Sequence, residues 1–328
     1  MIAKPPARRI PPFHPLFRNS HLQTALGHYW KRPDVDGRFP IEPRFYRTEP
    51  DVQVLVETQQ PTGRPQGDIV TVHGLEGSGR SPYIGSFGAA ALNAGYSVHR
   101  FNMRTCGGTE HLCQTLYHAG LTSDLLVVLR EMKREGCGPI FLVGFSLGGN
   151  VVAKLAGELG ADGPELLAGV CAVSAPLDLA ACSRWMARFQ NRVYERRFVK
   201  RMRQRLCATG RYSRRDFAGL NSVLAIDDRI TAPSFGFGNA ANYYRTQSAL
   251  GYIEGIEVPL LLIYSKDDTL VPSATFDDPA LTANRWIELL PTEHGGHLGF
   301  LARGSYRFWL DTALMEWVLA ARVRNVER

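Results

Sequence analysis

A serine stands in a glycine-rich turn between a strand-like and a helix-like segment, and this arrangement most constrains the fold of the chain. Residues 139–143 are an apolar run typical of a buried strand, and residues 144–148 read Gly-Phe-Ser-Leu-Gly. Residues 150–159 then have a helical composition. Glycines two positions before and after Ser146 let strand and helix approach closely while the serine backbone is strained. The pattern predicts a sharp turn that exposes the Ser146 hydroxyl at the carboxyl edge of a sheet.

The flanking strand and helix favour a nucleophilic Ser146 over a merely structural turn. A serine hydroxyl is a poor nucleophile at neutral pH, so it needs a base that accepts its proton and an acid that orients the base. The helix that begins after the serine also favours negative charge developing nearby. An acid and then a histidine are therefore expected downstream, in that order.

Two aspartates follow the next strongly apolar run. Residues 259–264 read as a fully buried parallel strand, and Asp267 and Asp268 lie on the loop just past its end. We assign the acid to Asp268, because in such loops the acid usually lies four residues before a proline, here Pro272. Asp267 is the alternative, and Asp178 could serve only in a variant layout.

The histidine that best fits the base follows the next strand. Residues 285–290 are apolar enough for a strand and lead to His294 and His297. We assign the base to His297, because the two glycines before it permit a loop that lays the imidazole over the serine. His294 is interpreted as a structural or supporting residue, and His73 as a residue packed under an earlier loop.

The oxyanion of the intermediate needs hydrogen-bond donors from two backbone positions. One is the amide of Leu147, the residue after the nucleophile. The other is expected on the loop after an earlier strand. Residues 68–72 form that strand and residues 73–79 its loop, where we assign Leu75 as the second donor.

Several motifs, in one order along most of the chain, resemble the YheT-like branch of the α/β-hydrolases, a set of esterases and lipases. The matching segments are 19–24, 73–78, 81–84, 102–109, 144–150, 227–233, 243–244 and 294–300. Two positions depart from the family pattern: Ser20 stands where proline is usual and Thr105 where glycine is usual. The resemblance implies an α/β-hydrolase fold and an enzyme that cleaves esters. Neither a cofactor nor a metal is expected. Because Thr105 borders the expected pocket, substrate preference is not carried over with the fold.

Alternating strand and helix patterns predict an α/β fold with a mostly parallel, doubly wound sheet, over 1–328 as one domain. Expected strands lie at 52–56, 69–72, 96–101, 140–143, 169–173, 260–264 and 286–290. The last helix is expected to bury Phe308, Leu310, Leu314, Trp317 and Val318. Residues 177–257 are too many for one connection, so they are predicted to form an inserted helical cap over the active site. Tyr243 and Tyr244 would line its pocket or hold the cap down.

The cap carries the basic charge of the chain. Twelve Lys or Arg and one acid, Glu195, lie between residues 183 and 215, although the formal net charge of the whole chain is only +7. Apolar residues recur there every four positions, at Trp185, Phe189 and Val193 and then at Tyr194, Phe198, Met202 and Leu206. This pattern favours helices with a basic outer face, packed on the core by their aromatic side. The alternative is a face that docks on anionic membrane or an acidic carrier. Nucleic acid is not an expected partner, because no recognition fold accompanies the charge.

The remaining composition favours a cytoplasmic protein. If the cap docks on a membrane, the protein would also be peripheral to that membrane. The six cysteines show neither a C-x-x-C pair nor metal-ligand spacing, and Cys106 is interpreted as a packing residue. Prolines interrupt residues 1–12, so no signal peptide is expected there. No uninterrupted apolar stretch is long enough to span a bilayer.

The sequence therefore predicts a serine hydrolase that cleaves short- to medium-chain carboxylic esters, lipids among them, through an acyl-enzyme on Ser146. An acyltransferase that uses the same three residues is the first alternative. A catalytically silent binding protein is the second, because fold and motif alone do not prove turnover.

Overall fold

One eight-stranded sheet lies at the centre of the protein, and its central strands carry apolar residues on both faces. The computed structural model describes residues 10–33 and 35–326. The strands are β1 (Glu42–Glu49), β2 (Val52–Gln59), β3 (Asp68–Val72), β4 (Ser97–Phe101), β5 (Ile140–Phe145), β6 (Gly169–Val173), β7 (Leu260–Ser265) and β8 (Ile287–Thr292). Their order across the sheet is β1-β2-β4-β3-β5-β6-β7-β8. The pairs β1–β2 and β2–β4 are antiparallel and the other pairs are parallel, which confirms the predicted mostly parallel α/β fold.

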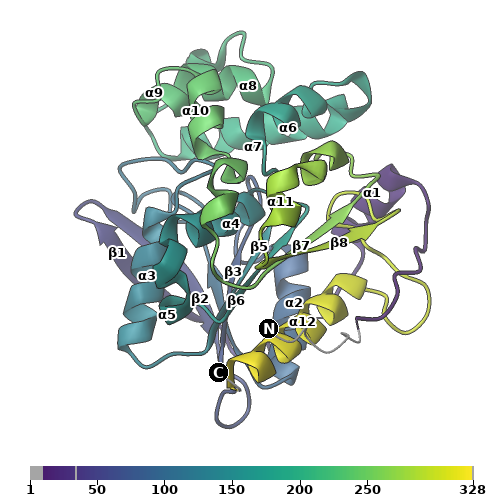
Figure 1. Cartoon of the computed structure of the whole chain (residues 1–328). Coiled ribbons are helices and arrows are strands. Elements are labelled where there is room, and N and C mark those ends of the chain that lie inside the picture. Colours follow the sequence, from purple (N-terminus) through teal and green to yellow (C-terminus); the bar gives the residue numbers. More distant parts are fainter. Residues whose placement is uncertain (1–9, 34, 327–328) are drawn as a thin grey trace.

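Helices cover both faces of this sheet (Figure 1). The larger helices of the core are α1 (Ser20–Tyr29), α2 (Pro82–Asn93), α3 (Ser123–Arg134), α4 (Leu147–Leu159) and α12 (Trp309–Val326), with short α5 (Gly163–Leu166) and α11 (Pro279–Ala283). Successive residues of a strand point to opposite faces, so each central strand serves two cores. On β7, Leu260 and Leu262 pack with α3 and α4, whereas Leu261 and Ile263 pack with α2 and α12.

The sequence analysis missed β1 at the edge of the sheet. Seven of its eight residues are exposed or half-buried and only Tyr46 is buried, so the strand lacks the apolar alternation that reveals β2. The expected last helix begins at Trp309, which is itself buried, while Phe308 lies just before it and is half-buried. The other expected residues of that helix, Leu310 to Val318, are buried as predicted.

The chain between β6 and β7 forms a helical layer beyond the carboxyl ends of the strands, seen at the top of Figure 1. Its helices are α6 (Leu179–Met186), α7 (Arg192–Ala208), α8 (Val223–Ile226), α9 (Ala232–Ser234) and α10 (Ala240–Gln247), with a π-helical turn at Asp227–Thr231. We keep residues 177–257 as the proposed cap. Its own small core includes Val199, Met202, Leu206 and Phe217.

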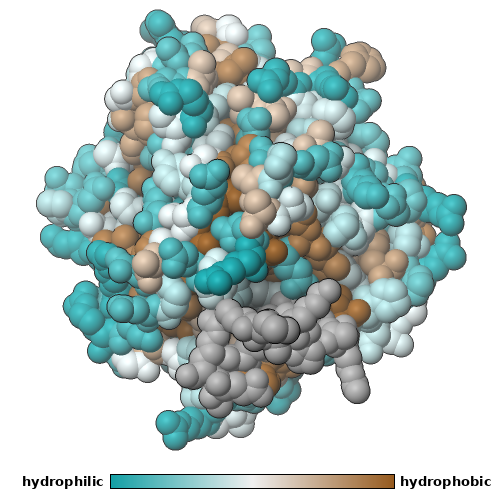
Figure 2. Space-filling view, in the orientation of Figure 1, coloured by the Kyte–Doolittle hydropathy of each residue, from teal (hydrophilic) through white to brown (hydrophobic). Residues whose placement is uncertain are grey.

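Part of the predicted apolar stripe of the cap does not pack on the core. Phe189 is 83% exposed and Val193 is 74% exposed, because α6 ends at Met186 and α7 turns a different face inward. Figure 2 shows hydrophobic atoms among hydrophilic ones over this part of the molecule. The four-residue spacing from Trp185 to Val193 therefore extends over two separate helices and does not mark one continuous buried face.

The expected absence of a signal peptide concerns residues 1–12, of which residues 1–9 lie outside the described part of the chain. Within that described part, no helix combines the length and apolar character that crossing a membrane requires.

Glycine at one position of α4 allows the helix to contact the segment before β7. A Cβ atom on Gly157 would overlap the carbonyl oxygen of Tyr252, whereas a Cβ atom on Gly85 in α2 would meet nothing within 4 Å. We predict that Gly157→Ala lowers the free energy of unfolding by about 1–3 kcal/mol through overpacking. Gly85→Ala is the matched control and should raise it by about 0.5–1 kcal/mol, because alanine favours the helix. Urea unfolding measures both, and equal shifts for the two variants would contradict the assignment of a close backbone contact.

Candidate active site

Ser146 lies in a strained turn that only glycine neighbours permit. Its backbone has φ 52° and ψ −122°, a conformation that residues with a Cβ atom rarely adopt. A Cβ atom on Gly144 would overlap the carbonyl group of Gly148, and one on Gly148 would overlap the carbonyl oxygen of Val72 at the end of β3. Because these two positions lack side chains, the backbones of β5, α4 and β3 can come into contact. Ser146 then lies at the carboxyl edge of the sheet.

The structure brings Ser146, His297 and Asp268 into one hydrogen-bonded chain. The Ser146 hydroxyl donates to His297 Nε2 across 2.8 Å. The other ring nitrogen, Nδ1, donates to both carboxylate oxygens of Asp268 at 3.0 Å. His297 is 8% exposed and Asp268 is 4% exposed, so little water competes for these bonds. The arrangement can carry a proton from the serine to the histidine, which is what nucleophilic catalysis requires.

Asp267, the alternative acid, hydrogen-bonds to a different histidine, His294. Its Oδ2 accepts from His294 Nδ1 at 3.2 Å, and its Oδ1 accepts from the amide of Gly296 at 2.9 Å. Asp267 thus holds the loop that carries His297 and does not contact the imidazole of His297 in the described structure. Asp178 caps the start of α6 by accepting from the amide of Ala181.

Asp268 is fixed by its own loop. Its Oδ1 also accepts from the amides of Leu270 and Val271 at 2.7 and 3.0 Å. These bonds orient the carboxylate toward the imidazole, so the side chain cannot rotate away without losing two backbone donors.

The two residues predicted to donate to the oxyanion line the same pocket as the serine. They are Leu75, after β3, and Leu147, after Ser146. The neighbouring amides of Gly74 and Glu76 donate to the hydroxyls of Tyr83 and Tyr117. In contrast, the Leu75 and Leu147 amides have no protein acceptor within the described part of the chain. Their role as oxyanion donors remains a prediction that this position favours.

His73 and Cys106 are packing residues in the structure. His73 is fully buried, donates from Nδ1 to the carbonyl of Gly74 and accepts at Nε2 from the amide of Met103. Burial lowers the pKa of His73 to about 4, so its imidazole is neutral at physiological pH. Burial likewise raises the pKa of the Cys106 thiol far above its usual range, which leaves no reactive thiolate.

A buried ion pair joins the cap to the loop of Leu75. The guanidinium of Arg205, on α7, lies 2.9 Å from the carboxylate of Glu76, and their side chains are 9% and 3% exposed. Arg205 also donates to the hydroxyl of Thr105 at 2.8 Å, and the Tyr117 hydroxyl donates to Glu76. The unusual Thr105 therefore contacts the cap directly. Sequence reasoning missed Arg205, because nothing local distinguishes it from the other arginines of α7.

The N-terminal helix α1 supports the loop of the histidine. The amide of His297 donates to the Thr24 hydroxyl at 2.9 Å, and that hydroxyl donates to the carbonyl of Ser20 at 2.8 Å. The Gln23 side chain exchanges hydrogen bonds with the backbone of Leu301 beyond the same loop. The family-like segment 19–24 was the sequence signal for this contact, and Ser20 contributes through its backbone.

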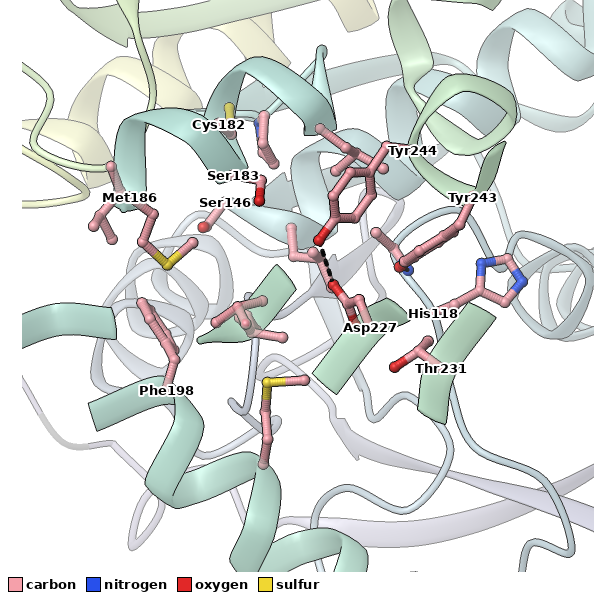
Figure 3. Close-up of a pocket in the computed structure, with 18 of the residues that line it drawn as sticks. His118, Ser146, Cys182, Ser183, Met186, Phe198, Asp227, Thr231, Tyr243 and Tyr244 are labelled. Carbon is pink, nitrogen blue, oxygen red and sulfur yellow. Dashed lines mark hydrogen bonds between the residues drawn. The ribbon is translucent and has the colours of Figure 1, made fainter. Parts of the chain in front are cut away.

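The pocket beside Ser146 runs between the sheet edge and the cap. It encloses about 770 Å³ of space, its open mouth included. Figure 3 shows Met186 and Phe198 on one side of Ser146, whereas Tyr243 and Tyr244 lie on the other. The two tyrosines line the pocket, yet they also hold the cap, because the Tyr243 hydroxyl accepts from the amide of Ala119.

Burial controls the charge of the titratable groups in the pocket. It raises the pKa of Asp227 to about 6, although hydrogen bonds from Tyr244 and Thr231 oppose the shift. It lowers the pKa of His118 to about 3 and raises that of the Cys182 thiol well above its usual range. At neutral pH the imidazole of His118 and the thiol of Cys182 are therefore neutral, whereas Asp227 is a carboxylate.

The turn, the acid loop and the histidine loop are arranged as in the α/β class of serine hydrolases. The chain matches the alpha/beta hydrolase family over residues 69–305. It is 34% identical over 314 residues to YheT of Escherichia coli, a protein provisionally named an esterase, and the match covers 92% of this chain and 91% of YheT. This chain therefore belongs to the α/β-hydrolase family, in its YheT-like branch, as the motifs predicted.

Other relatives and solved structures agree with this assignment. Monoacylglycerol lipase ABHD2 of Danio rerio is 28% identical over 330 residues, which cover 92% of this chain and 78% of that protein. The esterase Pf2001 of Pyrococcus furiosus superposes with a TM-score of 0.58 at 17% identity, covering 88% of this chain and 95% of that chain. At this identity the superposition supports the fold alone.

The two neighbouring aspartates give a sharp test of the site. We predict that Asp268→Asn lowers kcat for an ester substrate by about 10⁴-fold, because an amide cannot stabilise the imidazolium or fix its tautomer. Asp267→Asn removes the same charge one residue away and should cost at most about 100-fold, the worth of one hydrogen bond to a charged group. Steady-state kinetics compares the two variants, and an equal loss in both would remove the distinction between the aspartates.

Proposed function

We propose that this chain, a carboxylic-ester hydrolase of the α/β-hydrolase family, cleaves short- to medium-chain acyl esters through an acyl-enzyme on Ser146. The observation that supports it most is the hydrogen bond of 2.8 Å between the Ser146 hydroxyl and His297 Nε2. A silent binding protein would have no need of a strained serine held against a buried histidine and aspartate.

In the first half of the proposed reaction, the Ser146 oxygen attacks the ester carbonyl while His297 accepts the serine proton. Asp268 accepts the hydrogen bond of the resulting imidazolium and stabilises it. The oxyanion takes hydrogen bonds from the amides of Leu75 and Leu147, in a site where a lost donor typically costs about 10²- to 10³-fold in rate. The carbon–oxygen bond to the alcohol then breaks, and His297 protonates the departing alkoxide.

In the second half, water replaces the alcohol. His297 takes a proton from the water, whose oxygen attacks the acyl carbonyl of the Ser146 ester. The tetrahedral intermediate collapses, the proton returns to the Ser146 oxygen, and a carboxylic acid leaves. An alcohol in the place of water would give acyl transfer by the same steps, so product analysis with added alcohols separates hydrolysis from transfer.

The lining of the pocket supports an acyl chain as one part of the substrate. Met186, Phe198 and Met202 form an apolar wall, the kind of lining on which small-molecule ligands bind. Relatives that are named monoacylglycerol lipases support lipid esters as one substrate class. A cytoplasmic location is part of the proposal and rests on the composition of the chain, including buried thiols such as Cys106.

The proposal includes peripheral docking of the cap on an anionic lipid surface. Phe189 and Val193 are 83% and 74% exposed, and the exposed Arg188, Arg192 and Arg196 surround them in sequence. Apolar side chains that enter the interface, together with arginines that meet lipid phosphates, are the two contributions that bind proteins to such surfaces. This position would bring the cap, and the pocket under it, close to lipid esters.

The docking face predicts selective vesicle binding. The wild type should sediment with vesicles of phosphatidylcholine and phosphatidylglycerol but not with phosphatidylcholine alone. The double variant Phe189→Ser, Val193→Ser should bind at least about tenfold more weakly, since burying one such side chain fully is worth about 1.5–3 kcal/mol. Val323→Ser, on α12, removes an apolar side chain that is 57% exposed and lies away from the cap, and it is the control. Binding to an acidic carrier protein without any preference for anionic vesicles would overturn the lipid assignment.

The nucleophile is tested with a chain-length series of nitrophenyl esters. We predict activity that peaks at short or medium acyl chains and falls at least about 10⁴-fold in Ser146→Ala, the scale found when a nucleophile is removed. A fluorophosphonate probe should label Ser146 in the wild type and nothing in the variant. Equal turnover by both proteins, or no labelling where a control hydrolase reacts, would refute the assignment.

A further inference from the structure

The wall of the pocket opposite Met186 and Phe198 carries polar side chains, and these are more buried than the two apolar residues. Asp227, Thr231 and Tyr244 are 7%, 6% and 5% exposed, and all three line the pocket. Figure 3 shows Asp227 and Tyr244 joined by a hydrogen bond on the far side of Ser146 from Met186. An ester bound at Ser146 thus has an apolar wall next to one of its two portions, acyl or alcohol, and a polar wall next to the other.

A local irregularity of the cap creates this polar wall. Asp227–Thr231 is a π-helical turn between α8 and α9, and such turns are rare and frequent at functional sites. The segment 227–233 also stood out in the sequence, and the proposed reaction at Ser146 gives it no role. A buried carboxylate costs free energy, so its presence in the pocket of Ser146 calls for a reason.

Hydrogen-bond capacity shows what Asp227 can still bind. The Tyr244 hydroxyl donates its one proton to Asp227 Oδ2 at 2.8 Å, and Thr231 also hydrogen-bonds to the carboxylate. An ionised carboxylate can accept about four hydrogen bonds, so these two leave capacity for a donor from a ligand. The group that fits is therefore one that donates a hydrogen bond.

Burial favours a neutral donor over a cation. Arg205 lines the same pocket but is paired with Glu76, and the two charges shift the pKa of Asp227 in opposite directions. An ammonium group would lose far more hydration free energy in this buried pocket than a hydroxyl, which is neutral and donates one hydrogen bond. Hydroxyl groups also accept, which suits the wall because Ser183 adds a further hydroxyl to it.

We propose that Asp227, positioned by Tyr244 and Thr231, binds a free hydroxyl group on the alcohol portion of the substrate. Met186 and Phe198 then contact the acyl chain, and the enzyme prefers monoesters of diols and polyols to esters of simple alcohols. The inference rests on the proposed function, because it takes the ester to react at Ser146.

Two esters of nearly equal shape test the subsite. In 2-hydroxyethyl butyrate a hydroxyl takes the place of the terminal methyl group of propyl butyrate, and acid release measures the hydrolysis of both. The wild type should favour the hydroxylated ester in kcat/KM by about 10- to 100-fold, the worth of one hydrogen bond to a charged group. Asp227→Asn should bring that ratio close to one. The matched control is Asp228→Asn, which removes an exposed carboxylate one residue away and should leave the ratio as in the wild type.

Each other outcome has a definite meaning. Equal hydrolysis of the two esters by the wild type overturns the subsite while leaving the ester hydrolase intact, and this measurement needs no folded variant. Loss of activity on both esters to the same extent in Asp227→Asn shows that the residue only holds the cap, which also overturns the subsite. Failure of the wild type to cleave either ester, with no labelling of Ser146 by a fluorophosphonate, overturns the proposed function itself.

Discussion

The site depends on how closely β5, the turn at Ser146 and helix α4 approach the end of β3. A side chain at Gly148 would overlap the carbonyl of Val72, so the turn at Ser146 is in close backbone contact with the end of β3, where the loop with Leu75 begins. Between β3 and β5 the order of the strands reverses, because the chain first runs outward to β4 and then returns. Ligands of open α/β sheets bind at such reversals, and here the serine occupies that crevice.

The central strands and the three hydrogen-bonded side chains could be predicted from the sequence for a shared reason. Each of Ser146, Asp268 and His297 lies within five residues of the end of a strand whose apolar residues stand out, and the carboxyl ends of parallel strands meet at one edge. The local motif then distinguishes one serine, aspartate or histidine from its neighbours. Strand β1 lacks that signal, because its side chains cover no core apart from Tyr46.

The pocket walls could not be predicted to the same degree. The contact of Arg205 with Glu76 and Thr105 depends on how α7 packs over a loop about a hundred residues earlier in the chain. The spacing of Phe189 and Val193 predicts a buried face, yet both are exposed, because four-residue spacing holds within one helix only and the chain turns between α6 and α7. Tertiary packing, which propensity and spacing do not encode, decides both cases.

The hydrogen bond between Thr24 and the backbone of His297 bears on where the functional part of the chain begins. The alpha/beta hydrolase match begins at residue 69, yet the loop of His297 is held by a helix of residues 20–29. A boundary drawn from family similarity would therefore cut away part of the apparatus that aims the imidazole. Evolution could likewise adjust turnover through changes in α1 that leave every wall of the cavity untouched.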